Sequence, residues 1–134
     1  MLNALHNEAL GKLILRLGVG GLILLHGIAK LLNPSSLSWI GDQVARYGLP
    51  EFLAYGVLIG EIVAPVMLLL GWHARIAALL ITINMVVAII LVHTHELFTL
   101  GSSGGWALEL QGMFLVGALT IVFTGSGRMA IRPD

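Results

Sequence analysis

The sequence contains no cysteine, which excludes disulfides, thiol redox chemistry, thiolate-bound metals and iron–sulfur clusters. Charge is also scarce: only 10% of the 134 residues are charged, whereas an average chain has about 25%. Seven acidic and seven basic residues give a formal net charge of zero, so the composition does not indicate nucleic-acid binding. So few charges cannot form the polar surface that a soluble domain of this size needs.

Apolar residues are abundant instead. They make up 57% of the chain, and the mean hydropathy is +0.96. A membrane-spanning helix needs about 20 mostly apolar residues. Four runs meet this requirement, at residues 13–32, 52–71, 75–93 and 106–124. The sequence therefore predicts one all-α domain over residues 1–134, an integral membrane four-helix bundle.

The segment SSLSWIGDQVARYGLP, between the first two runs, predicts a short helix that lies in the membrane interface. Ser35 or Ser36 is a suitable N-cap, and Gly48 and then Pro50 would end the helix. An ordinary capped connector is the alternative, and neither structure spans the membrane. The apolar stripe of this segment consists of Leu37, Ile40, Val44 and Tyr47, whereas Asp42, Gln43 and Arg46 lie largely off it.

The basic residues predict an orientation. An even number of spans places both termini on one side, together with the second loop. Five basic residues belong to that side and two to the other, which predicts an inner-membrane protein with both termini in the cytoplasm. We expect Arg16 to extend toward the cytoplasmic headgroups. The five are Lys12, Arg16, Arg75, Arg128 and Arg132, and the two are Lys30 and Arg46.

Small residues predict where the helices touch, because they let two backbones approach closely in lipid. Each predicted span carries at least two of them at helical spacing, and the polar residues of the spans tend to share their faces. We therefore expect the polar side chains to face protein. The small residues are Gly20 and Gly27, then Gly56, Gly60 and Ala64, then Ala77 and Ala88, and finally Gly112 and Gly117.

Glu61, in the segment GEIVAP, is the most unusual residue of the chain. It lies about 14 Å below the start of the second span, close to the bilayer midplane. A charged group there costs about 3 kcal/mol or more, so it needs a partner or a function. Pro65 has no N–H, so the Glu61 carbonyl also loses its α-helical partner. The carboxylate and the free carbonyl of Glu61 together predict a polar centre inside the bundle.

Other polar residues are expected to extend this centre into a pocket open to the outer face. The candidate ligand-binding residues are His26, Lys30, Glu61, Asn84, His93 and Glu109. Structural roles are the alternative: Glu61 protonated or paired with His26 or Asn84, and Lys30 in an ion pair with Glu109. His93 and His95 would then simply face water. Trp39, Trp72 and Trp106 fall at predicted interfaces, where aromatic anchors are common.

Metal and haem sites are not predicted. His26, Glu61, His93 and Glu109 would form a plausible set of metal ligands, but the chain lacks the Glu-x-x-His pairs of di-iron bundles. A haem would need two facing histidines, and His93 points away from the Asn84 face. No Gly-rich phosphate loop, Ser-His-Asp arrangement or metalloprotease motif is present.

Four segments in order, LLHGIAKLL, GEIVAPVMLLLGWHARIAALLI, MVVAIILVH and FTGSGRMAI, resemble the DoxX family of small bacterial and archaeal membrane proteins. The tail departs from the family pattern, because Ser126 replaces a common proline and Met129–Ala130 replace a Ser-Leu pair. The resemblance implies a link to quinol or thiosulfate oxidation, or to quinone or thiol stress, and it matches Lys30, Glu61 and His93 to the family's polar positions.

Our leading hypothesis is therefore an accessory subunit, or a binder of a small quinone-like ligand, in a membrane redox process. Glu61 would exchange a proton with the ligand or bond to its hydroxyl, with His26 and Asn84 orienting it. Any catalysis would belong to a membrane oxidoreductase complex with partner proteins. The alternatives are a small proton-coupled permease, which would have to be a homo-oligomer, and a non-catalytic scaffold.

Overall fold

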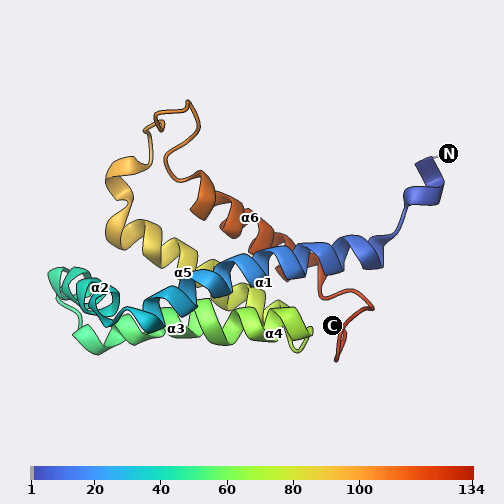
Figure 1. Ribbon diagram of the computed structural model, residues 1–134, viewed down its shortest axis with the longest axis horizontal. Coiled ribbons are helices and arrows are strands. Elements are labelled where there is room, and N and C mark those ends of the chain that lie inside the picture. The colour runs from blue at the N-terminus through green and yellow to red at the C-terminus, as the bar shows by residue number, and fades with distance from the viewer. Residues whose placement is uncertain (1) are drawn as a thin grey trace.

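The computed structural model describes residues 2–134 and is all-helical, as the sequence predicts. No strand occurs within this range, only two isolated β-bridges, Trp72 with Arg132 and Leu100 with Trp106. Helix α1 (Glu8–Leu32) is the longest element (Figure 1). It begins five residues before the predicted span because the Asn7 side chain accepts a hydrogen bond from the Leu10 N–H and caps it.

The second span is a continuous helical stretch, Glu51–Leu70, but it is not regular. A 3₁₀ helix, η2 (Glu51–Tyr55), is followed by α3 (Gly56–Leu58), a π-helical turn η3 (Ile59–Val63) and α4 (Ala64–Leu70). In η3 the Ala64 N–H bonds to the Ile59 carbonyl, five residues earlier. The turn lies just before Pro65, which has no N–H to offer the Glu61 carbonyl in a regular α-helix.

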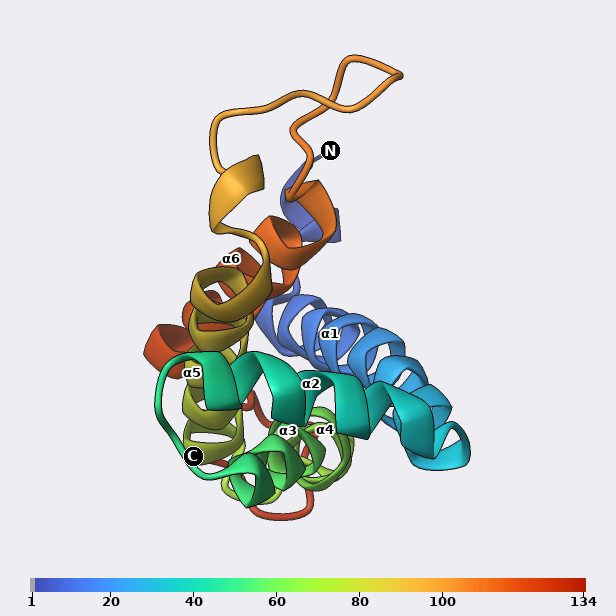
Figure 2. The ribbon, with the colours of Figure 1, turned by 90° about the vertical axis from the view of Figure 1, so that its left-hand side faces the viewer.

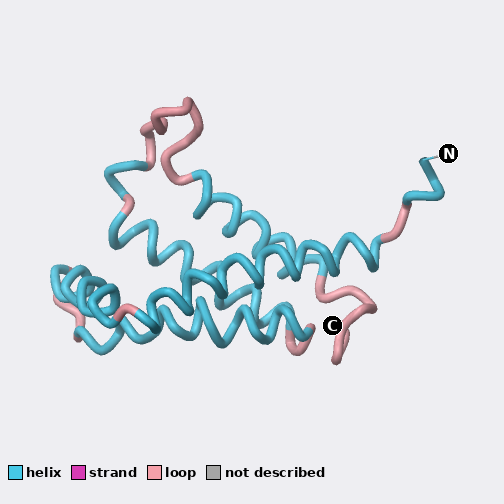
Figure 3. The backbone as a smooth tube through the Cα atoms, in the orientation of Figure 1, coloured by secondary structure: helices cyan, strands magenta, loops and turns pink. Residues whose placement is uncertain are grey.

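A tight turn connects α4 to α5 (Ala74–Val92), where Gly71 and His73 both have positive φ. A short 3₁₀ helix, η4 (Thr94–Glu96), and a long loop lead to α6 (Glu109–Thr124). Figure 3 shows this loop as a long non-helical segment that extends away from the helices.

Within residues 2–134, three helical stretches are long and apolar enough to cross a membrane: Glu8–Leu32, Glu51–Leu70 and Ala74–Val92. Helix α6 has 16 residues, about 24 Å, and is shorter than a hydrocarbon core of about 30 Å. The predicted fourth span starts three residues too early. The Trp106 side chain donates to the Leu97 carbonyl and its backbone bridges Leu100, which holds this residue in the loop.

Helix α2 (Pro34–Arg46) lies across one end of the molecule, over α1, α3 and α5 (Figure 2). Its N-cap is Asn33, not Ser35 or Ser36, because Pro34 occupies the first helical position. The prediction for Gln43 was also wrong, since this side chain is buried together with Val44. The Tyr47 hydroxyl donates to the Ile90 carbonyl over 3.1 Å and ties the end of α2 to α5.

The helices enclose a common core, in which α1 packs against α4 and α6, and α5 packs against α4 and α6. Small residues permit the closest approaches. A methyl group at Gly27 would collide with the Glu61 carbonyl, and one at Gly20 would lie 3.1 Å from the Pro65 carbonyl oxygen. Gly56 faces open space instead, and Gly112 contacts only Trp106, so these two were wrongly predicted as helix contacts.

The outer surface is strongly apolar. Large side chains such as Ile14, Leu25, Val116 and Phe123 are 62%, 63%, 59% and 75% exposed. Soluble monomers rarely expose such extended apolar surface. The exterior therefore contacts lipid, which agrees with the predicted membrane location.

Arg16 does not extend to the headgroups. It is 1% exposed, and its guanidinium donates to the carbonyls of Leu68 (2.8 Å), Ser126 (2.9 Å) and Leu69 (3.4 Å), and to that of Met129. Carbonyls at the end of α4 and in the tail therefore accept the guanidinium N–H groups in place of lipid headgroups.

The C-terminal segment after α6 folds back onto the turn between α4 and α5. The Ile131 N–H donates to the Leu70 carbonyl, and the Arg132 N–H donates to the Gly71 carbonyl. The Asp134 carboxylate accepts from the backbone N–H groups of Arg75 and Ser126. The two termini and this turn lie at one end of the molecule, and α2 lies at the other (Figure 1).

Candidate functional site

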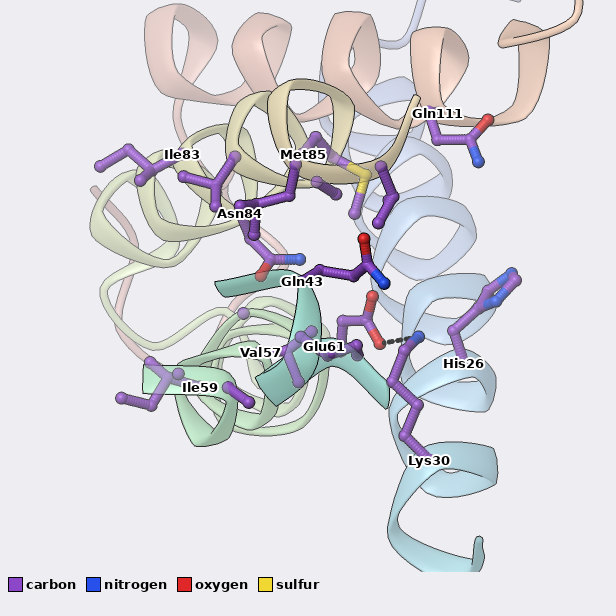
Figure 4. A pocket seen from close by; sticks show the side chains of 18 of the residues that line it. His26, Lys30, Gln43, Val57, Ile59, Glu61, Ile83, Asn84, Met85 and Gln111 are labelled. Atoms are coloured by element: carbon purple, nitrogen blue, oxygen red, sulfur yellow. Dashed lines mark hydrogen bonds and ion pairs between the residues drawn. The ribbon is translucent and has the colours of Figure 1, made fainter. Parts of the chain in front are cut away.

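Glu61 lies in the π-helical turn, is 6% exposed, and pairs with Lys30 of α1. The Lys30 Nζ and the Glu61 Oε2 are 2.7 Å apart (Figure 4). The predicted pairs of Glu61 with His26 or Asn84, and of Lys30 with Glu109, are therefore wrong. Those pairs assumed regular helices, in which Lys30 would not lie opposite Glu61.

The pairing depends on the approach of the two backbones. Gly27 of α1, three residues before Lys30, lies against the Glu61 carbonyl where no Cβ would fit. The extra residue in a π turn also rotates the side chains that follow it. Such turns occur often at functional sites. The sequence signals for this geometry are Gly27 and Pro65.

Asn84 of α5 packs its side chain onto Gly60. A methyl group at Gly60 would lie 2.5 Å from both the Cβ and the Cγ of Asn84. The Asn84 Nδ2 is buried and has no hydrogen-bond partner among residues 2–134. A buried unpaired donor costs about 1–3 kcal/mol, so this group needs a further explanation.

The ion pair and Asn84 face a cavity of about 550 Å³. Its volume falls in the range of small-molecule sites, about 300–1,000 Å³. Its lining is also typical of such sites, because the walls are apolar and carry a few polar groups. The walls come from α1, α2, the irregular second stretch, α5 and α6. The polar lining residues are His26, Lys30, Gln43, Glu61, Asn84, His93 and Gln111.

Two of these were missed as site residues. Gln43 of α2 is 8% exposed and projects into the space near Glu61, and Gln111 lies on α6 at the far wall (Figure 4). The signal for Gln43 was present: it follows Ile40 by three residues and precedes Tyr47 by four, so it shares their helical face. Trp39 also lines the cavity, whereas the sequence suggested only an interfacial anchor.

The predicted histidines lie at the margin of the site. The His26 ring contacts Phe114 edge-on, with centroids 5.8 Å apart, and lies apart from the Glu61 carboxylate (Figure 4). The His93 Nδ1 is 3.1 Å from the Oε1 of Glu96, a residue that the sequence analysis did not single out. His95 also contacts Glu96, at 3.3 Å, and its side chain is 74% exposed.

Glu109 does not belong to the cavity. It is exposed at the start of α6 and lies beside Gly105 in the loop. The structure therefore brings together His26, Lys30, Glu61, Asn84 and His93 as lining residues and leaves Glu109 out. In the described part of the chain, no group of three or more His, Asp or Glu side chains could hold a metal ion.

Comparison with known proteins places the chain among membrane proteins. It is 33% identical to the uncharacterized membrane protein Rv3486 of Mycobacterium tuberculosis, over 95% of this chain and 83% of that protein. It is 27% identical to CatD of Bacillus subtilis, provisionally named an oxidoreductase, over 92% and 86% of the two chains. An uncharacterized Haemophilus influenzae protein is 33% identical over 87% of this chain and 84% of that protein.

No solved structure matches the chain. The DoxX family model matches residues 11–94, from α1 to the start of η4, and so includes Lys30, Glu61, Asn84 and His93. Since this match covers more than half of the sequence, the chain belongs to the DoxX family.

Proposed function

We propose that this protein binds a small lipophilic molecule of the quinone type in its cavity and acts as an accessory subunit in a membrane redox process. One observation carries the proposal: an apolar cavity of about 550 Å³ contains an ion pair between the part-buried Lys30 and the buried Glu61. Apolar walls would hold the body of such a ligand, and the polar groups would orient its oxygen atoms.

The outer part of the cavity wall favours a ligand that arrives from the bilayer. Trp39, Ile59 and Ile83 line the cavity and are also 52%, 49% and 52% exposed. These side chains belong to the apolar surface that contacts lipid. A molecule dissolved in the membrane would reach Glu61 between them without crossing a polar barrier.

In this proposal Glu61 bonds to the ligand or exchanges a proton with it, and Lys30 holds the carboxylate in place. The oxidoreductase name of the Bacillus subtilis relative supports a redox context. A carrier would use the same polar groups as a path, and a scaffold would use them only for packing.

The test is mass spectrometry of small molecules that copurify with the protein in native lipid. We expect a quinone with the wild type, and its loss from Glu61→Gln. Glu51→Gln, which changes an exposed carboxylate outside the cavity, is the matched control and should retain the quinone. An absence of quinone from all three proteins would contradict the proposal, and substrate uptake by liposomes would then support the carrier.

We also propose that the protein lies in the inner membrane with both termini in the cytoplasm. Without the buried Arg16, four basic residues still flank the end with the termini: Lys12, Arg75, Arg128 and Arg132. Since the chain has no cysteine, single cysteines report the topology directly. An impermeant maleimide should label Ser103→Cys on spheroplasts but not Asn3→Cys, and the reverse pattern would contradict this orientation.

A further inference from the structure

We propose that the site recognises a neutral hydroxyl group, so that it binds the reduced, hydroquinone form of its ligand more tightly than the oxidised quinone. This inference rests on the proposed function and adds which redox state the site prefers. It depends on three features of the cavity: a free carboxylate oxygen, an unpaired amide donor on another wall of the same cavity, and a local charge that is already balanced.

The free acceptor is the Glu61 carboxylate. Its Oε2 accepts from the Lys30 Nζ, whereas its Oε1 has no hydrogen-bond partner among the described residues. An ionised carboxylate can only accept hydrogen bonds. A ligand that enters the cavity can therefore donate a hydrogen bond to the Oε1.

The unpaired donor is the Asn84 Nδ2, which has no partner within residues 2–134. Asn84 packs its side chain on Gly60, the residue before Glu61, and both Asn84 and Glu61 line the cavity. In Figure 4 the Asn84 amide and the Glu61 carboxylate both extend toward the Gln43 amide. A ligand oxygen that lies between them would accept from Asn84 and face Glu61.

The chemistry of that oxygen follows from its two neighbours. A hydroxyl oxygen accepts from the amide and donates its proton to the carboxylate, which satisfies both groups. A quinone carbonyl satisfies only Asn84 and leaves two acceptors facing each other. A site with a buried unpaired group discriminates strongly between such ligands.

The charge of the site excludes an anionic head group. Lys30 and Glu61 neutralise each other at 2.7 Å. A fatty-acid or phosphate group would add a second negative charge beside Glu61 and compete for Lys30. The His26 ring contacts Phe114 and the His93 ring contacts Glu96, so neither is paired with the Glu61 carboxylate.

The test measures binding of a decyl-substituted benzoquinone and of its hydroquinone, under anaerobic conditions, to the full chain in nanodiscs. We expect the hydroquinone to bind at least 10-fold more tightly. For a two-electron couple this preference raises the midpoint potential of the bound pair by about 30 mV.

Two variants assign this preference to Asn84. Asn84→Leu keeps the shape of the side chain and leaves the ion pair intact, and it should reduce the preference several-fold. Thr82→Val is the matched control on the same helix, because the Thr82 hydroxyl bonds to the Ala78 carbonyl outside the cavity, and it should keep the preference.

The outcomes separate the two proposals. Equal binding of both forms, tighter binding of the quinone, or an unchanged preference in Asn84→Leu would overturn the hydroxyl preference and leave the ligand class standing. Failure of both forms to bind the wild type would overturn the proposed function as well.

Discussion

At the scale of single residues, the energetics of the Lys30–Glu61 pair decide what each substitution does. Removing one partner of a buried pair leaves an uncompensated charge. The Glu61 side chain is 8% exposed, but that of Lys30 is 24% exposed and partly screened. We expect Lys30→Met to destabilise the protein by about 2 kcal/mol, below the values of fully buried pairs. Equilibrium unfolding in detergent measures this loss.

A double variant provides the control for that prediction. Lys30→Met combined with Glu61→Leu removes both charges and should recover most of the lost stability. Lys12→Met removes a looser pair, in which the Lys12 Nζ lies 3.9 Å from Glu8 and the Glu8 side chain is 71% exposed, and it should cost less than about 1 kcal/mol. If Lys30→Met were no more destabilising than Lys12→Met, this result would contradict the burial of the Lys30–Glu61 pair.

Gly27 tests the backbone contact at the same site. Gly27→Ala places a methyl group against the Glu61 carbonyl and Ile62, and we expect a loss of about 1–3 kcal/mol together with weaker quinone binding. Gly21→Ala, on the same helix with open space around it, should have little effect or stabilise by up to about 1 kcal/mol. Similar unfolding curves for the two variants would contradict the close approach.

The sequence predicted Glu61 and the small residues around it better than it predicted their pairing. Glu61 could be singled out because a carboxylate within an apolar run is energetically costly in a membrane. Gly27 and Gly60 could be singled out because small residues at helical spacing indicate helix contacts. Which residue faces Glu61 depends on helix tilt and on the π turn, which periodicity does not encode. The burial of Gln43 was missed because its polarity outweighed its position on the helical face.

At the scale of elements, Pro65 determines the register of the second stretch. Pro65→Ala restores an N–H and permits a regular α-helix through residues 59–63. The Glu61 side chain would then rotate away from Lys30. We expect at least 10-fold weaker quinone binding, measured by ligand titration, in a protein that circular dichroism shows to be still helical. Unchanged affinity would show that the π turn does not position Glu61.

The element boundaries show where local sequence is sufficient and where it is not. Helix α5 (Ala74–Val92) lies within one residue of its prediction at each end, because its apolar run and flanking turn are unambiguous. The start of α6 was wrong because a tertiary contact, from Trp106 to Leu97, holds the loop. In the local sequence, only Pro65 indicated that the second stretch would contain a π turn.

At the scale of the whole molecule, Arg16 joins three parts of the chain: α1, the end of α4 and the C-terminal segment. Arg16→Met leaves several carbonyls without their donor, and we expect a loss of about 3 kcal/mol. Arg16→Lys should restore only part of it, since a lysine cannot reach separate carbonyls in a planar geometry.

Limited proteolysis measures the same contact in the tail. Cleavage after Arg128 should accelerate in Arg16→Met but not in Arg46→Met, which removes an exposed arginine from α2. Equal cleavage rates would contradict a role of Arg16 in holding the tail. The sequence did not predict this role, because an arginine near a helix end is ordinarily expected to reach the headgroups.

Photolabelling with an azido-benzoquinone in native membranes, followed by peptide mass spectrometry, shows whether the cavity holds a lipophilic ligand. We expect adducts on cavity residues such as Trp39, Ile59 and Ile83, and we expect unlabelled hydroquinone to compete with them. Leu17, Val116 and Phe123 are similarly exposed but lie outside the cavity, and should remain unlabelled. Even labelling of both sets would contradict the account.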